Sequence, residues 1–412
     1  MTPGARFGML VRMQEASGAS GGLVGRLRNA EASSRVTTFE LFFDLVYVFA
    51  FTQVSRLMAE THSAFGILQA LVVLALMWWT WAAFGWLANQ APADQPVMRV
   101  GMSAAMIAVF VAALVIPESY EDLPGGWHGP LVLALAYTLV RLIHMALYIV
   151  AAGDDAALRR QVLVTQAVAM APASTALIVG AVVGGPWQTW IWLAAFAYDA
   201  VLTWASSRGG GGWRIHSTAH WTERYGLIVI LALGESIVAI GVGVAREPID
   251  APITAGVVLA VVLSILLWWA YFGRLAEAGE HALERREGPA RVVLALHAYT
   301  YVHLVIVAGV ILTALGVEEA MAHIGDAEPF GWFGASALAA GLGAYVAATV
   351  VFARLVGGRW PVTRIIGALV LAASVPLLAI VAPMAALAIA VGVLGAMLIA
   401  ESAIGVRAAA TE

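Results

Sequence analysis

Apolar segments of about 20 residues, separated by short stretches rich in Gly, Pro or charge, recur along almost the whole chain. Because an α-helix rises 1.5 Å per residue, about 20 apolar residues cross the hydrocarbon core of a bilayer. Only 12% of the 412 residues are charged and 61% are hydrophobic, whereas a soluble domain carries roughly 25% charged residues. The pattern predicts an all-α polytopic membrane protein with about twelve transmembrane helices. The expected helices cover residues 38–59, 65–88, 99–116, 129–151, 161–183, 188–205, 222–244, 253–272, 291–315, 333–356, 362–381 and 384–404.

The arginines predict the orientation of these helices. All 22 basic residues are arginine, since the chain contains no lysine. If the N-terminus lies in the cytoplasm, nearly all of them fall on the cytoplasmic side, the exceptions being Arg56, Arg246 and Arg141, which lies within a helix. The opposite loops, 117–122 and 318–328, are acidic. Arginine is enriched in cytoplasmic loops, so both termini are expected in the cytoplasm.

Landmarks recur in the same order in the two halves of the sequence. Arg160 precedes Pro172 by twelve residues, and Arg364 precedes Pro376 by twelve. Tryptophan pairs also recur, in 77–87 and 267–275. This order predicts two tandem six-helix repeats, which are parallel because six is even and are related by an axis along the membrane normal. The expected parts are a disordered cytoplasmic tail (1–34), the first repeat (35–205), a Gly-rich linker (206–219), the second repeat (220–405) and a cytoplasmic C-terminus (406–412).

Ionisable side chains inside the predicted helices point to a functional or structural role. A charge at the bilayer centre costs about 2.5–3.5 kcal/mol on insertion scales, so each needs a partner or a task. In the first helix, Asp44, Tyr47 and Ser55 share one face, and Glu40 lies one turn below. This stripe predicts either a polar seam between helices or the lining of a pathway or binding cavity, and the sequence leaves both interpretations open.

Depth along the predicted helices groups further residues into two levels. The shallower level, roughly 9 Å from the cytoplasmic ends, contains Asp44, His144, Asp199 and His297. The deeper level, roughly 15–18 Å in, contains Arg141, Glu235 and His303. Since a guanidinium does not deprotonate in proteins, we expect Glu235 or Asp199 to neutralise Arg141. The predicted binding or coupling residues are Asp44, Glu235, His303, Glu40, Tyr47, Arg141, Asp199 and His297.

The residues that are missing exclude several function classes. Without cysteine there are no disulfides, thiolate metal sites or cysteine nucleophiles, and without lysine there is no Schiff-base chemistry. A net charge of −4 argues against nucleic acid binding. Known phosphate-loop, metalloprotease and dinucleotide motifs are absent, so we predict no cofactor and no metal site. The expected partners are the lipid bilayer and a small ion or solute, and homo-oligomerisation is left open.

Three segments resemble the bacterial low temperature requirement A (LtrA) family. They are ELFFDLVYVFAFTQVS (40–55), HWTERYGLIVILALGESIVAIG (220–241) and YVHLVIVAGV (301–310), and the resemblance covers residues 35–405. It implies a polytopic protein of the bacterial inner membrane, named for a cold-growth phenotype, and it brings no established substrate or reaction. The positions that match the family motifs are Glu40, Asp44, His220, Glu223, Arg224, Gly226, Gly234, Glu235 and His303.

The favoured function is transport of a small ion or solute through a polar site between the repeats. In this interpretation Asp44 and Glu235 are proton or cation sites, and His303 is a pairing or relay group. Glu223 and Arg224 are expected to anchor their helix at the membrane interface. The alternatives are an intramembrane enzyme that uses the same groups on a lipid-like substrate, which is less favoured, and a membrane scaffold or assembly factor.

Overall fold

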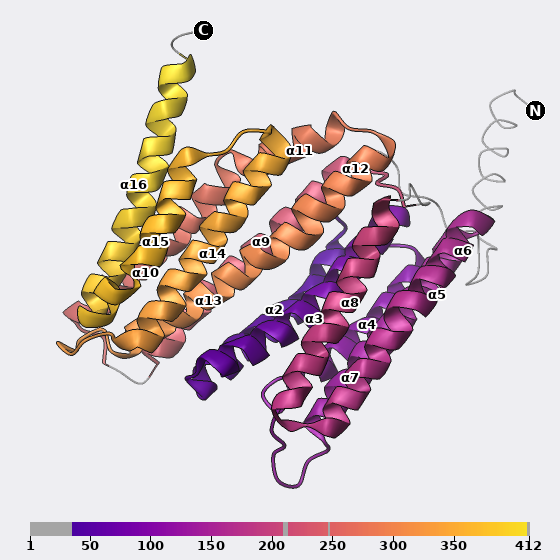
Figure 1. Ribbon diagram of the computed structural model, residues 1–412, viewed down its shortest axis with the longest axis horizontal. Helices are drawn as coiled ribbons and strands as arrows, with labels where there is room; N and C mark the ends of the chain where they lie inside the picture. Colours follow the sequence, from indigo (N-terminus) through magenta and orange to yellow (C-terminus); the bar gives the residue numbers. More distant parts are fainter. Residues whose placement is uncertain (1–34, 209–212, 246–247, 410–412) are drawn as a thin grey trace, which may run out of the picture.

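The computed structural model describes residues 35–208, 213–245 and 248–409, and within them the chain is helical, with no strand. The predicted tail 1–34 and parts of the predicted linker and C-terminus lie outside these residues. The helices, drawn in Figure 1, are α2 (Thr38–Thr61), α3 (Ala64–Gln90), α4 (Pro96–Leu114), α5 (Gly129–Ala152), α6 (Ala156–Thr165), η1 (Gln166–Met170), α7 (Ala171–Val183), α8 (Gly185–Arg208), α9 (Thr218–Gly243), α10 (Ala251–Phe272), α11 (Leu275–Glu284), α12 (Gly288–Leu294), η2 (Ala295–Tyr301), α13 (Val302–Ala322), α14 (Gly331–Gly357), α15 (Val362–Ile380) and α16 (Pro383–Ala409).

Eleven helical segments of the described chain are long and apolar enough to cross a membrane. The prediction of an all-α polytopic membrane protein is therefore confirmed. The expected helix 188–205 lies in α8, whose Trp, Gln and Asp residues lower its hydropathy, so α8 is not among the eleven and its crossing stays a prediction. The relation of two superposable six-helix repeats also stays a prediction.

Helix α2 begins with a capping box that orients the Glu40 carboxylate. The Thr37 side chain accepts a hydrogen bond from the Glu40 backbone N–H at 3.3 Å, and Glu40 Oε1 accepts one from the Thr37 backbone N–H at 3.2 Å. Such reciprocal bonds satisfy backbone N–H groups that have no partner within the helix. They also hold the Glu40 side chain at the start of α2, with its other oxygen directed into the protein.

Helix α2 lies between the two halves of the molecule, residues 35–208 and 213–409. It packs against α3 and α4 of its own half and against α9 and α13 of the other half (Figure 1). The second half is held together mainly by α13 and α14, which approach closely at Gly309, Gly316 and Gly341. Small residues permit such contact, which supplies packing energy where lipid offers no hydrophobic driving force.

Two spans are interrupted by π-helical segments, and one expected span is followed by a helix that the sequence did not predict. Segment η1 separates α6 from α7, and η2 separates α12 from α13. Such bulges inside α-helices are frequent at functional sites. Helix α11 follows the predicted helix 253–272 and lies at the same end of the bundle as the C-terminal end of α16 (Figure 1).

Candidate functional site

Two carboxylates of α2 and one guanidinium of α9 form a buried ion-pair network between the halves. Arg224 donates to Glu40 (Nη1 to Oε2, 2.7 Å) and to Asp44 (Nη2 to Oδ1, 2.9 Å). Trp81 Nε1 donates to the same Asp44 oxygen at 2.9 Å. None of these four side chains is exposed by more than 1%. The two acids of the stripe that the sequence placed on one face of α2 form here a seam to α9.

The predicted role of Arg224 as an interface anchor is wrong. The first turns of α9 pack against α2, so the guanidinium is covered by protein and neutralises both acids instead of reaching lipid headgroups. Neighbouring Glu223 is exposed enough to serve the expected role: it accepts the Val36 backbone N–H at 3.1 Å and lies 3.9 Å from Arg35.

His220 extends the network toward the chain that joins the halves. Its Nε2 lies 2.8 Å from Glu40 Oε2, and its Nδ1 lies 3.3 Å from Asn89 Nδ2. The Asn89 amide is oriented by two further bonds: Nδ2 donates to the Ser217 carbonyl, and Oδ1 accepts the His216 N–H, both at 2.7 Å. His220 therefore accepts at Nδ1 and donates at Nε2. The network ties α2, α3 and α9 together.

Glu235 lies farther along the same pair of helices. Its Oε2 accepts a hydrogen bond from Thr52 of α2 at 2.6 Å, and Glu318 of α13 lies within electrostatic range. The adjacent Glu319 pairs with His62 at 3.0 Å. Glu235, Glu318 and Glu319, the acids at this end of α9 and α13, therefore have no arginine partner among the described residues.

His303 lies in a cluster of aromatic rings. Tyr271 donates to its Nε2 at 2.7 Å, and its Nδ1 donates to the Ala298 carbonyl at 2.9 Å. The ring is stacked on Tyr299 at 5.0 Å between centroids and is edge-on to Tyr225. Both ring nitrogens are thus satisfied within the protein, and the structure does not pair His303 with Asp44 or Glu235.

Two further candidates of the predicted site, Tyr47 and His297, also lie apart from each other. Tyr47 shares a hydrogen bond of 3.0 Å with Thr80 of α3 and is fully buried. His297 lies in η2, half-buried, with its ring 6.3 Å from that of Tyr301.

The prediction that an acid neutralises Arg141 is confirmed, and the acid is Asp199. Arg141 Nη2 lies 3.0 Å from Asp199 Oδ2, and both side chains are buried. Arg141 Nη2 also lies 3.5 Å from Gln166 Oε1 of η1. The pair therefore joins α5, α8 and the first π-helical segment.

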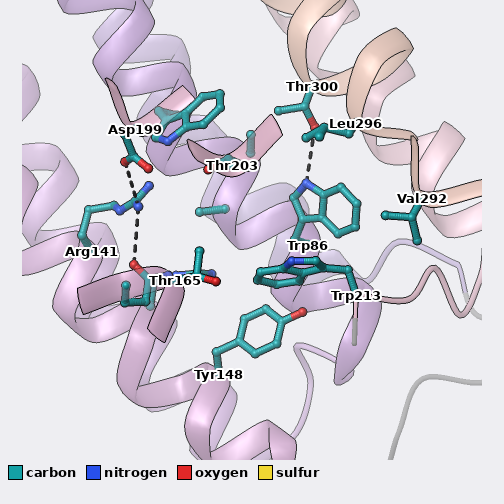
Figure 2. Close-up of a pocket in the computed structure, with 15 residues that line it drawn as sticks. Trp86, Arg141, Tyr148, Thr165, Asp199, Thr203, Trp213, Val292, Leu296 and Thr300 are labelled. Carbon is teal, nitrogen blue, oxygen red and sulfur yellow. Dashed lines mark hydrogen bonds and ion pairs between the residues drawn. The ribbon is translucent and has the colours of Figure 1, made fainter. Parts of the chain in front are cut away.

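A cavity adjoins this ion pair where α3, α5 and α8 meet α12 and η2 of the other half (Figure 2). The space open to water is about 70 Å³, enough for roughly five molecules if each needs 10–15 Å³. The polar side chains in its wall are Arg141, His144, Thr165, Gln166, Asp199, Thr203 and Thr300. The aromatic ones are Trp79, Trp86, Tyr148 and Trp213.

Polar atoms without a partner gather at this cavity. Arg141 Nε, both oxygens of Asp199 and both ring nitrogens of His144 are buried and make no geometrically sound hydrogen bond to the described residues. The Arg141 guanidinium and the backbone of Ala83 lie within electrostatic range of the His144 ring, which also contacts the rings of Phe84 and Tyr148. Buried polar groups are nearly always satisfied, so this concentration marks a place suited to a polar ligand.

Parts of this cavity could not be assigned from sequence. Arg141 and Asp199 were predicted, and His144 was assigned to the same level as Asp199. Gln166, Thr165 and Thr203 were missed, because single hydroxyl and amide groups are common in membrane helices. The π-helical segments that contribute Gln166 and Thr300 have no recognisable sequence signal.

Comparison with known proteins identifies a family but no activity. The family model described as "Bacterial low temperature requirement A protein (LtrA)" matches residues 35–399. An uncharacterised protein of Rhizobium meliloti (strain 1021), RA0937, is 27% identical over 297 residues, which is 69% of this chain and 69% of that protein. No solved structure matches.

Proposed function

Since the chain belongs to the LtrA family of bacterial membrane proteins, we propose that it transports a small polar solute through the cavity beside Arg141 and Asp199. We place it in the bacterial inner membrane with both termini in the cytoplasm, following the distribution of its arginines. The protein is a polytopic membrane protein, so a polar cavity between its halves suggests movement of a solute past the apolar barrier.

The observation that carries the proposal is the group of unsatisfied polar atoms around one cavity. The donor Arg141 Nε and the acceptor Asp199 Oδ1 have no hydrogen-bond partner among the described residues, Asp199 Oδ2 is engaged by the ion pair with Arg141, and the His144 ring can serve as donor or acceptor. A solute that both donates and accepts hydrogen bonds would satisfy them. The cavity limits its size, since about 70 Å³ is well below the roughly 150 Å³ of an engineered cavity that binds benzene.

The halves of the molecule would move relative to each other around this cavity. Trp213, Val292, Leu296 and Thr300 come from the second half, and the other lining side chains come from the first half. Alternating access by movement of two halves around a fixed site is common among transporters. We assign Glu40, Asp44 and His303 to structural roles and retain Glu235, which has no arginine partner among the described residues, as the proposed site of a coupled proton or cation.

The test is solute flux in proteoliposomes with a variant that fills the cavity. Ala83 lines the cavity on α3, and Ala83→Leu adds bulk without a charge. Wild-type protein is assayed against K⁺, Na⁺, H⁺, small organic anions and small amino acids. At least one flux should exceed that of empty vesicles and should be abolished by Ala83→Leu and by Asp199→Asn.

The matched control is Thr175→Ala on α7. Thr175 is exposed, and among the described residues its hydroxyl bonds only to the Ala171 carbonyl of the same helix, so flux should be unchanged. Wild-type flux equal to that of empty vesicles for every solute would end the proposal for these substrates. Full flux in Ala83→Leu would remove the cavity from the pathway.

A further inference from the structure

A second recess lies on the opposite side of the second half, between α10 and α16 and next to the start of α15. It encloses about 820 Å³ of space open to water. Its polar lining is Arg274, Arg364, Glu401 and Ser402, and its apolar lining includes Trp269 and Ile399. We call this recess the α10–α16 groove. It does not contact the Arg141 cavity and has no part in the proposed transport.

The groove carries excess positive charge. Arg364, on the first turn of α15, pairs with Glu401 of α16 through Nε and Nη2 at 3.0–3.1 Å. Only 3% of the Arg364 side chain is exposed, and its buried Nη1 has no hydrogen-bond partner among the described residues. Arg274, between α10 and α11, is exposed. Two arginines face one glutamate, so one positive charge is not compensated within the groove.

The apolar wall of the groove faces the surroundings of the protein. Trp269 is 55% exposed and Ile399 is 73% exposed, although both lie on helices apolar enough to cross a membrane. Arg274 lies just after the end of α10 and Arg364 in the first turn of α15, whereas Leu266 and Trp269 lie earlier on α10, so the arginines and this apolar wall lie at successive depths. This order matches a phospholipid, with its headgroup at the membrane surface and its chains below.

We infer that the α10–α16 groove binds an anionic phospholipid, with the headgroup phosphate between Arg274 and Arg364 and an acyl chain along Trp269 and Ile399. Arginine binds phosphate with directed, charge-assisted hydrogen bonds, and Arg364 Nη1 has a donor that Glu401 does not use. The distribution of arginines predicts that this end of the bundle faces the cytoplasm. On that side of a membrane, basic pockets between helices bind the headgroups of anionic lipids.

The test is lipid binding to the full-length protein in detergent, measured by native mass spectrometry with phosphatidylglycerol and, separately, phosphatidylcholine. Wild-type protein should retain phosphatidylglycerol in preference to phosphatidylcholine. Arg274→Gln should weaken phosphatidylglycerol binding about fivefold, the effect of one basic residue near an anionic membrane surface. Arg274 is exposed and makes no ion pair among the described residues, so folding should be unaffected.

Two further variants separate site binding from general charge. Arg359→Gln removes an exposed arginine at the same end of the bundle but outside the groove, and binding should be unchanged. Arg364→Gln combined with Glu401→Gln removes the buried charges together, and it should also lose the preference. Three outcomes would overturn the inference. Wild-type protein could bind the two lipids equally, Arg359→Gln could weaken phosphatidylglycerol binding as much as Arg274→Gln does, or millimolar inorganic phosphate could displace phosphatidylglycerol.

Discussion

Replacing Arg224 with methionine should be among the most destabilising single changes in the protein. The substitution keeps an unbranched side chain but leaves Glu40 and Asp44 buried without the cation that lies 2.7 and 2.9 Å from them. Removing one partner of a buried ion pair costs about 3–5 kcal/mol, and here one substitution removes two pairs. We therefore expect a loss of at least about 3 kcal/mol in the free energy of unfolding.

The assay is equilibrium unfolding of the detergent-solubilised protein by titration with SDS, followed by tryptophan fluorescence. Arg56→Gln is the control, because Arg56 pairs with Glu60 at 2.7 Å on an exposed part of the same helix, α2. Exposed pairs at this helical spacing contribute about 0.3–0.5 kcal/mol, so the two variants should differ roughly tenfold in their effect.

A triple variant tests the physical reason. Replacing Glu40 and Asp44 with leucine alongside Arg224→Met removes every charge of the pair network, and such exchanges are often neutral or stabilising. The triple variant should therefore regain much of the stability that Arg224→Met loses. An Arg224→Met protein as stable as Arg56→Gln, or a triple variant less stable than the single one, would refute the seam interpretation.

Two further substitutions probe packing and hydrogen bonding. Gly341→Ala should lower stability by about 1–3 kcal/mol, because a Cβ there meets the backbone of α13, whereas Gly343→Ala, on the same helix with open space, should not; melting temperatures of the pair check this. Tyr271→Phe should cost about 1–3 kcal/mol, because it leaves the His303 ring nitrogen without its donor. Tyr198→Phe, which removes a hydroxyl from an exposed side chain, should cost less, and equal melting temperatures for the two would contradict the role given to His303.

The membrane-spanning helices were predictable from the sequence. An apolar segment long enough to cross a bilayer must satisfy its own backbone hydrogen bonds there, which an α-helix does. The partner of Arg141 was also narrowed to two acids, Glu235 and Asp199, since a buried guanidinium requires a carboxylate to neutralise it. The partner of Asp44 was not, because helical depth gives a level but not a direction around the axis. Arg224 lies near a helix start, where sequence favours an interface anchor, and only the packing of α9 on α2 shows that it is buried.

The residues of the predicted transport site were separated for the same reason. His303 and Glu235 fall at similar depths, yet they face different neighbours: the first meets Tyr271 and the second meets Thr52. Neither contact could be inferred from the sequence, because Tyr and Thr are common in membrane helices. Periodicity within one helix cannot report which other helix lies opposite.

The π-helical segment η2 determines how α12 and α13 are turned relative to each other. In an α-helix each residue advances about 100° around the axis, so one residue more or less in this segment would rotate every side chain on one side of it by that angle. Thr300, within η2, accepts hydrogen bonds from two indole N–H groups: Trp78 donates to its carbonyl and Trp86 to its hydroxyl. The same hydroxyl is hydrogen-bonded to Tyr225, while His303, just beyond η2, is hydrogen-bonded to Tyr271. A single-residue deletion between Ala295 and Tyr301 would leave the span long and apolar enough to cross a membrane but would break one of these two sets of contacts. We therefore expect a conservative substitution in this segment to disturb the structure less than a change in residue number.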